Sequence, residues 1–427
     1  MKSVPMLSGA FLQPAGQALP QPLLALRKAR SEALANMAMP TRKTENWKYS
    51  SKYLKLTEDM AATLPASAEP SPLDVPGYRI VLNNGVVNRS DSQYPDHKGI
   101  NVQRFGDLDD ETAGKLADQL DSTLDPKVTQ FAQVNSARFE DGLLIQLAAD
   151  TVLDKPLFII HQAQASQNGS AFPRIFVEAA NHSQMTLVEV YVSAGSSAAL
   201  VDTVTEFQLA DGASITSIRL TMEGETVQHI GATGVRQQRN SRFESHCVGF
   251  GGPLRRHDLQ VRLEGEGAET KLNGVVVTQD KQHYDNHTAI DHVAAHCNSD
   301  ETYRNIAADE SHAVFKGRIH IHQDAQKSNA NMNNRNLLLS NGAEIDTKPE
   351  LEIYADDVKC AHGATIGQLD ETSIFYLVSR GIDRRQAKIL LTMAFINELV
   401  EQIPVEAVRD AAHARLSGFF EQTFQEA

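Results

Sequence analysis

The fold is decided by three passages near the C-terminal end of the chain: FKGRIHIH (315–322), NMNNRNLLLSNGAEI (331–345) and LEIYADDVKCAHGATIG (351–367). Apolar residues fall two apart in these passages, as at Ile319 and Ile321 or at Leu351 and Ile353, so one face of each strand is buried and the other is polar. Asn-Gly, Asp-Asp and His-Gly pairs, which favour turns, separate the segments. The pattern predicts a sheet that turns a corner every few residues, with Leu337, Leu339, Leu351 and Ile353 inside it.

The same pattern of short predicted strands begins upstream, at Gly142. Apolar runs lie at LLIQL (143–147), LFII (157–160), RIFVE (174–178) and MTLVEVYV (185–192). No segment between the strands suits the helices of repeated strand–helix–strand units, so a solenoid or an antiparallel sandwich remains. The irregular strand lengths favour the coils of a parallel β-helix. The Asn-Gly pairs at 84, 273 and 341 are hairpin signals and keep the sandwich as the alternative.

Helical spacing of apolar residues is confined to the two ends of the chain. Residues 22–37 and 109–120 predict helices, whereas residues 61–76, rich in Ala, Ser and Pro, resemble a linker. We expect Trp47, the only tryptophan, to anchor this region by packing. The first 135 residues are therefore predicted to be irregular and partly helical.

The C-terminal end is predicted to contain two helices. Asp383 to Gln386 fits a capping box, and Pro404 fits the first turn of a second helix. These helices could cap the solenoid or present a docking surface. The predicted regions are a partly helical part (1–135), a β-helix core (136–370) and C-terminal helices (371–427).

Composition excludes several classes of function. The 427 residues carry a formal net charge of −14, with 22% charged and 41% hydrophobic residues, which is typical of a soluble acidic protein that binds neither nucleic acid nor membranes. There is no apolar run of ~18 residues and no signal-peptide pattern at the start, so we expect a cytoplasmic protein with its three cysteines reduced. No phosphate-binding Gly-x-x-x-x-Gly-Lys-Ser/Thr loop is present, so any ATP chemistry must come from a partner.

Two groups of histidines could hold a metal ion on an outer strand face. His283 and His287 share a face with Asp285, but four residues of strand separate the imidazoles by ~13 Å, which favours a solvated polar face over one shared ion. His320 and His322 share a face ~7 Å apart at the backbone. A metal ion would fit there, although solvated partners of a half-buried strand are commoner.

Cys360 and His362 form a third candidate site on one strand face. A thiol beside an imidazole can be held as a thiolate, the form that binds soft metals or sulfur, and we expect a turn at Gly363 to expose the pair. The alternative for Cys360 is a buried structural cysteine.

Several motifs resemble a known family: AQK (325–327), NRNLLLS (334–340), DVKC (357–360), HGAT (362–365), FYLVSRG (375–381) and, near the N-terminus, PTRKTENWKY (40–49). Together they resemble the SufD family, the non-ATPase scaffold subunits of the Suf iron–sulfur cluster assembly machinery. Gly363 stands where we would expect a glutamate in the SufB-type paralogues, and no Cys-x-x-Cys is present, so the D-type is favoured.

The resemblance implies a right-handed parallel β-helix and a non-catalytic subunit that acts with a SufB-like paralogue and a SufC-like ATPase. It implies that Cys360 and His362 lie near the interface with the SufB-like partner and share a transient iron–sulfur cluster or iron there. Flavin binding is expected at most in the complex, and the isolated chain could pair with itself. The candidate docking residues for the ATPase follow Gly381: Arg384, Arg385, Leu390, Leu391 and Phe395.

Two alternatives remain open. The chain could be a SufB-like paralogue that acts as the main cluster scaffold. It could instead be a carbohydrate-active β-helix enzyme, which needs paired carboxylates in an aromatic cleft. Asp356 and Asp357 would face opposite sides of a strand, and only 6% of residues are aromatic, which disfavours the enzyme.

Overall fold

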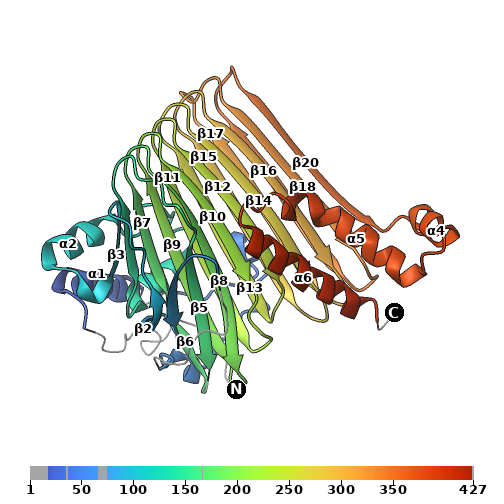
Figure 1. The fold of residues 1–427 in the computed structure, drawn as a ribbon, viewed down its shortest axis with the longest axis horizontal. Coiled ribbons are helices and arrows are strands. Elements are labelled where there is room, and N and C mark those ends of the chain that lie inside the picture. The colour runs from blue at the N-terminus through green and yellow to red at the C-terminus, as the bar shows by residue number, and fades with distance from the viewer. Residues whose placement is uncertain (1–17, 35–36, 66–74, 166, 426–427) are drawn as a thin grey trace.

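The chain coils into a parallel β-solenoid of about 8 turns, with helices at both ends (Figure 1). The computed structural model describes residues 18–34, 37–65, 75–165 and 167–425. Strands of successive turns pair in parallel, for example β12 with β14 and β13 with β15. The predicted β-helix is confirmed, and the sandwich alternative is wrong.

The described strands form two ten-stranded sheets. Sheet I runs in the order β2 (Val86–Gln93), β1 (Tyr78–Asn83), β5 (Leu157–Ala165), β8 (Gln184–Gly195), β10 (Ser214–Thr221), β12 (Arg242–Phe250), β14 (Glu269–Thr278), β16 (Asn298–Ala307), β18 (Asn329–Leu338) and β20 (Lys359–Gln368). Sheet II runs in the order β19 (Glu344–Ile353), β17 (His312–Ile321), β15 (His283–His292), β13 (Leu254–Leu263), β11 (Val227–Gln237), β9 (Ala199–Leu209), β7 (Arg174–Ala179), β4 (Leu143–Leu147) and β3 (Ile100–Arg104), with β6 (Gly169–Ala171) beside β9.

The turn signals in the sequence have different outcomes. Asn84 and Gly85, with φ of +52° and +85°, connect the antiparallel strands β1 and β2, as a hairpin signal should. Asn273 and Gly274 instead lie within β14. The parallel coils turn mainly at residues in the left-handed region, such as Asn240 and Asp309, which tolerate positive φ because their short side chains bond locally. Asn-Gly therefore does not by itself distinguish a hairpin from a solenoid.

Apolar side chains fill the space between the two sheets. Rows of inward residues, such as Leu187, Ile215 and Leu272, form the main core. The predicted interior residue Leu337 is buried, but it packs on the outer face of sheet I, and the half-buried Leu339 packs against the same outer cluster. The prediction placed them inside because it did not foresee that helices cover the outside of this sheet.

Helices α1 (Gln21–Leu34), α2 (Asp110–Gln119) and α3 (Gln130–Arg138) lie beside the first turns of the solenoid (Figure 1). The chain also forms short 3-10 helices η2 (Glu45–Trp47), η3 (Glu58–Ala61) and η4 (Phe105–Asp107). Trp47 is buried, as predicted, and packs against Phe131. Of the predicted linker, residues 66–74 lie outside the described part of the chain.

Three strands before residue 135 join the solenoid, which the sequence pattern did not predict. β1 pairs in parallel with β5, and β3 pairs antiparallel with β4, so residues 78–104 extend both sheets. The division at residue 135 stays a prediction.

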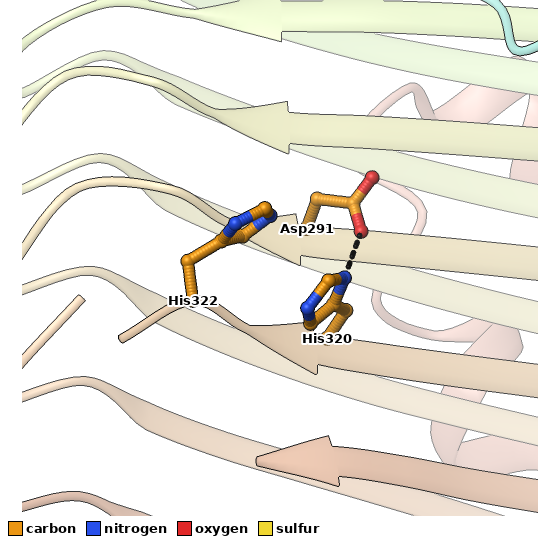
Figure 2. A group of neighbouring side chains, drawn as sticks. All are labelled: Asp291, His320 and His322. Carbon is orange, nitrogen blue, oxygen red and sulfur yellow. Dashed lines mark ion pairs between the residues drawn. The ribbon is translucent and has the colours of Figure 1, made fainter. Parts of the chain in front are cut away.

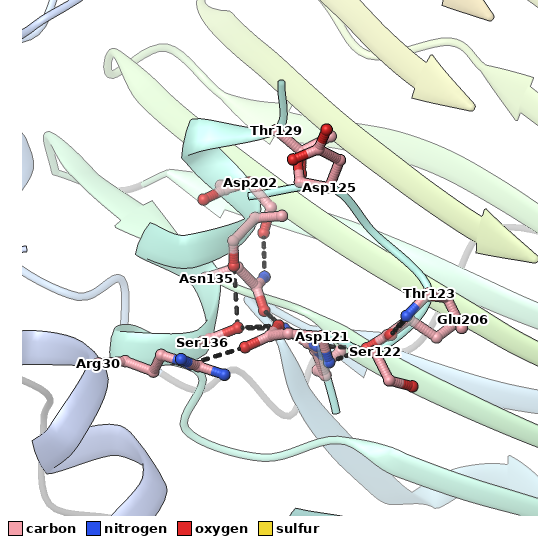
Figure 3. A network of polar contacts seen from close by, with 12 residues as sticks. Arg30, Asp121, Ser122, Thr123, Asp125, Thr129, Asn135, Ser136, Asp202 and Glu206 are labelled. Atoms are coloured by element: carbon pink, nitrogen blue, oxygen red, sulfur yellow. Dashed lines mark hydrogen bonds and ion pairs between the residues drawn. The ribbon is translucent and has the colours of Figure 1, made fainter. Parts of the chain in front are cut away.

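A buried polar network fastens α3 and the segment before it to sheet II (Figure 3). The Arg174 guanidinium forms ion pairs with Asp121, at 2.8 Å, and with Glu206. Ser136 on α3 donates a hydrogen bond to Asp121, and Asn135 donates to the carbonyl of Asp202. Since Arg174 is fully buried, these two carboxylates balance its charge away from water.

The chain ends with α4 (Glu371–Ser379), α5 (Arg384–Val400) and α6 (Glu406–Thr423). Asp383 caps α5, because its carboxylate accepts a hydrogen bond from the backbone N–H of Gln386, as predicted. α5 and α6 lie across the outer face of sheet I, whereas α4 lies beyond the last strand (Figure 1). No helix in the described ranges is long and apolar enough to cross a membrane.

Candidate functional site: the open end of the solenoid

The last turn of the solenoid is left uncovered. β19 and β20 each pair with the preceding turn on one side only, and no described strand pairs with their free edges. Nearly all side chains of β20 are exposed. Three apolar side chains at this end are exposed: Ile353 at the end of β19 (42% exposed), Tyr354 directly after it (64%) and Ile366 on β20 (47%). Such an edge offers unpaired N–H and C=O groups to another chain.

This bare end corrects one part of the predicted interior. Leu351 packs against the inner core, but Ile353 is exposed, because no strand in the described part of the chain pairs with the outer edge of β19 to cover it.

Cys360 and His362 lie on β20 and share a face, as predicted. They are the register partners of Ala330 and Met332, two residues of the inner core. The side chains of Cys360 and His362 therefore lie in the rows of inward-facing side chains that contain Ala330 and Met332, at the open end of the solenoid. Cys360 packs partly against the inner core, whereas His362 is exposed. A group bound there would contact the solenoid on one side and a partner on the other.

Two details of this site differ from the prediction. Gly363 lies within β20 as the register partner of Asn333, so it forms no turn; the pair is exposed because the solenoid ends there. Partial burial raises the pKa of the Cys360 thiol, which favours the protonated form in the isolated chain. A thiolate at Cys360 therefore needs a cation or a metal ion that this chain does not place beside it among the described residues.

Behind His362 the solenoid interior contains polar groups that sequence reasoning missed. The register of sheet I places Leu272, Glu301, Met332 and His362 in one inward row. Glu301 is fully buried, and although Thr288 stabilises the carboxylate, burial raises the pKa of Glu301 to about 8. A buried carboxylic acid thus lies two strands inside the open end.

A second buried polar group occupies the middle of the interior. Arg219 Nη1 donates a hydrogen bond to the hydroxyl of Tyr191, and Arg219 Nη2 lies 2.6 Å from His229 Nε2. Burial alone would raise the pKa of Glu189, but the imidazole of His161, 3.4 Å away, and the charge of Arg219 outweigh it and lower the pKa to about 2. Glu189 is therefore charged where Glu301 is neutral.

The sequence contains a signal for these residues that the prediction did not use. In MTLVEVYV (185–192), Met185 and Leu187 face inward, and the alternate positions Val188 and Val190 are apolar too. Apolar residues on both faces are typical of a strand that is buried on both sides. A lone glutamate in such a strand cannot face water, so Glu189 is interior.

The first histidine grouping is buried rather than solvated, so that prediction was wrong. His283, Asp285 and His287 do lie on one outer face, but residues 47–53 cover it: Ser50 Oγ is 2.9 Å from His283 Nε2, and the Tyr53 ring stacks on His283. Arg256 pairs with Asp285 at 2.7 Å. This grouping holds the N-terminal segment in place.

The predicted docking residues lie in α5, with different exposures. Arg384 and Arg385 are exposed; Arg384 pairs with Glu371 at 2.7 Å, and Arg385 donates to the carbonyl of Glu421. Leu390 is 44% exposed. Leu391 and Phe395 are half-buried.

The more exposed apolar surface lies next to these residues, on α4. Phe375 and Tyr376 are 70% and 55% exposed, and Val378 is 39% exposed. Phe375 and Tyr376 belong to the FYLVSRG motif that carries the family resemblance, but they were not among the predicted docking residues.

Comparison with known proteins identifies the family. The family model "SUF system FeS cluster assembly, SufBD core domain" matches residues 160–395. The iron–sulfur cluster assembly protein SufD of Escherichia coli is 30% identical over 399 residues, which cover 90% of each protein. A SufBD family protein of Synechocystis is 30% identical over 90% of this chain and 88% of that protein, and the chloroplastic protein ABCI7 of Arabidopsis thaliana is 27% identical over 93% and 86%. The chain belongs to the SufBD family of SUF-system iron–sulfur cluster assembly proteins and is SufD-like.

Proposed function

We propose that this chain is a non-catalytic scaffold subunit that pairs its bare end, β19 and β20, with a SufB-like paralogue. The bare end carries the proposal: a strand of ten residues with a free edge and exposed apolar side chains is unusual on a soluble monomer, which normally blunts or covers its edges. A paralogue of the same fold could continue the stack and bury Ile353, Tyr354 and Ile366.

In this proposal Cys360 and His362 act at the interface, where a nascent cluster or iron is the cargo. Thiolate sulfur and imidazole nitrogen are ligands for iron, and the pair faces the junction between the two interiors. The partner would supply the remaining ligands and the positive charge that favours the Cys360 thiolate. The proposed roles are iron acquisition and support of cluster formation.

The C-terminal helices are proposed to dock a SufC-like ATPase. α4 and the start of α5 combine exposed apolar side chains with the exposed cations Arg384 and Arg385. Aromatic residues and arginine are enriched at the centres of protein interfaces. Movement of the ATPase would then reach sheet I through α5 and α6, which pack on it.

The interface is tested by co-expression with a SufB-like and a SufC-like protein. Ile366→Lys places a charge on the bare edge and should abolish co-purification of the paralogue. Val152→Lys is the matched control, because Val152 is 55% exposed but lies at a corner near the first turns. Both variants should melt like the parent. Co-purification that survives Ile366→Lys would show that β20 does not form the interface.

ATPase docking is tested separately, with point variants. Deleting the chain from residue 383 would uncover the apolar outer face of sheet I, so loss of binding could reflect unfolding. Phe375→Ser with Tyr376→Ser, and independently Leu390→Asp, should release the ATPase while the paralogue stays bound. If the ATPase stays bound to both variants, this docking surface is wrong.

A further inference from the structure

A cluster of side chains of types that can ligate a metal ion lies on the outer face of sheet II (Figure 2). It is separate from Cys360 and His362, which lie on β20 of sheet I. Asp291 of β15 and His320 of β17 are register partners, and His322 directly follows β17. The ligand atoms that these three side chains offer all lie within 4.8 Å of one another. All three residues are half-buried, so they are fixed by the sheet yet reachable from solvent.

We propose that Asp291, His320 and His322 bind one divalent first-row transition metal ion, with water completing its coordination. Two imidazole nitrogens and one carboxylate oxygen are the donor set of open zinc sites and of non-haem iron(II) sites. Adjacent in-register strands position two of the three donors, which limits the cost of assembling the site.

The side chains need only small rotations to surround an ion. The rings of His320 and His322 are stacked, with centroids 4.2 Å apart and planes at 20°, so their nitrogen lone pairs run side by side. Asp291 Oδ1 lies 3.5 Å from His320 Nδ1. The second torsion of histidine has broad preferences, so both rings can turn toward one point at little cost.

The surrounding charges permit a dication. Arg318 Nη2 lies 3.0 Å from Asp291 Oδ1, and Arg262 Nη1 lies 3.8 Å from Asp291 Oδ2, and these cations would oppose a metal ion. Glu352 lies 3.2 Å from Arg318, however, and Glu264 lies 3.1 Å from Arg262. Glu264 also pairs with Arg236, at 2.8 Å, so three carboxylates face three guanidiniums and the charges around the site are balanced. A carboxylate has lone pairs enough to keep one arginine contact while it binds a metal, and such an outer partner fixes its orientation.

A second cluster with suitable residue types is less available. His312 Nε2 lies 2.8 Å from Asp346 Oδ2, and its Nδ1 lies 3.4 Å from the hydroxyl of Tyr53. Both ring nitrogens are already engaged, so a metal ion there would have to break existing hydrogen bonds.

The test measures metal binding by the full chain with Cys360→Ser and His362→Ala, so that the open end contributes no ligands. Zn²⁺ is the first probe, because it binds N/O sites more tightly than Fe²⁺, and Co²⁺ reports coordination through its visible absorption. Zn²⁺ titration calorimetry should show a saturable site. His322→Ala and Asp291→Asn should each weaken it by at least ~10-fold, since even loss of an outer partner of a ligand commonly costs ~10–100-fold.

The matched control is His413→Ala, which removes a histidine that pairs with Glu401 on the C-terminal helices. It should leave Zn²⁺ affinity and the Co²⁺ spectrum unchanged. The proposal is overturned if the parent shows no saturable binding of Zn²⁺ or Co²⁺, or if binding is the same in both site variants. Because Cys360 and His362 are replaced in every protein compared, either result is independent of the proposed interface.

Discussion

The first turns of the solenoid are covered by helices and fastened by a buried ion network, whereas the last turn ends on two uncovered strands. Both ends face the same physical problem, because the terminal turn of a stacked sheet has no neighbour to bury its apolar residues. At the start, this chain solves the problem with its own residues. At the end it leaves apolar side chains exposed, which supports the proposal that another protein completes the stack.

The largest effect should come from breaking the covered end. Arg174→Ala would leave the buried carboxylate of Glu206 without its cation, and Asp121 with Arg30 alone, so we expect a loss of ~3–5 kcal/mol in the free energy of unfolding. At the bare end, Lys327→Ala removes an ion pair with Asp357 in which both side chains are more than half exposed, so the loss should be ~0–1 kcal/mol. Urea denaturation measures the free energy of unfolding of both variants. Equal losses would mean that ion pairs stabilise the two ends to the same extent.

The next effect compares two inward leucines. Leu272→Ala creates a cavity in a fully enclosed part of the core and should cost ~2–5 kcal/mol. Leu351→Ala, in the last turn of sheet II, should cost less in the isolated chain, because its side chain is already partly exposed. In the complex with the paralogue the cost at Leu351 should rise. A constant cost would show that the partner does not cover β19.

The two buried glutamates should respond to pH with opposite signs. The pKa of Glu301 is raised from 4.5 to about 8 on folding, so the folded chain holds an extra proton between these pH values and loses stability as pH rises across that window. Relative to Glu301→Gln, the parent should therefore melt progressively lower between pH 4.5 and about 8. The comparison of melting temperatures with Glu301→Gln checks this.

At Glu189 the sign reverses. Its pKa is lowered from 4.5 to about 2, so its contribution to stability is present above pH 4.5 and is lost as pH falls toward about 2. The parent should lose stability relative to Glu189→Gln over that acidic window. The same sign at both glutamates would contradict the difference in their environments.

The smallest effect on stability is expected at the open end itself. His362→Ala removes an exposed side chain and should change the free energy of unfolding by no more than ~0.5 kcal/mol. Complex formation should persist, while the yield of iron–sulfur cluster in the assembled complex should fall. Met332→Ala, the buried register partner, should show the opposite pattern of lower stability. An unchanged cluster yield would remove His362 from the mechanism.

Period-two alternation was enough to predict strands with one buried face, but the choice of a solenoid over a sandwich came from the irregular strand lengths and the family resemblance. The alternation could not place Leu337, because both faces of sheet I are buried and only the packing of α5 and α6 decides which cluster Leu337 joins. It also missed Glu301 and Arg219, since polar residues in a strand were read as solvent-facing. The shared face of Cys360 and His362 followed from spacing alone. That this face lies at the end of the stack, and not at a turn near Gly363, depends on how many turns the whole chain makes.

The packing of α5 and α6 on sheet I has a consequence for how the molecule moves. The outer cluster joins residues of both helices to Val190 in β8, Ile218 in β10, Val248 in β12 and Ile306 in β16. A stack in which each turn contacts only its neighbours would bend and fray turn by turn. The two helices contact several turns at once and hold them in a fixed arrangement. We therefore expect a displacement of the C-terminal helices to move these turns and the bare end together as one rigid body, instead of bending the stack turn by turn.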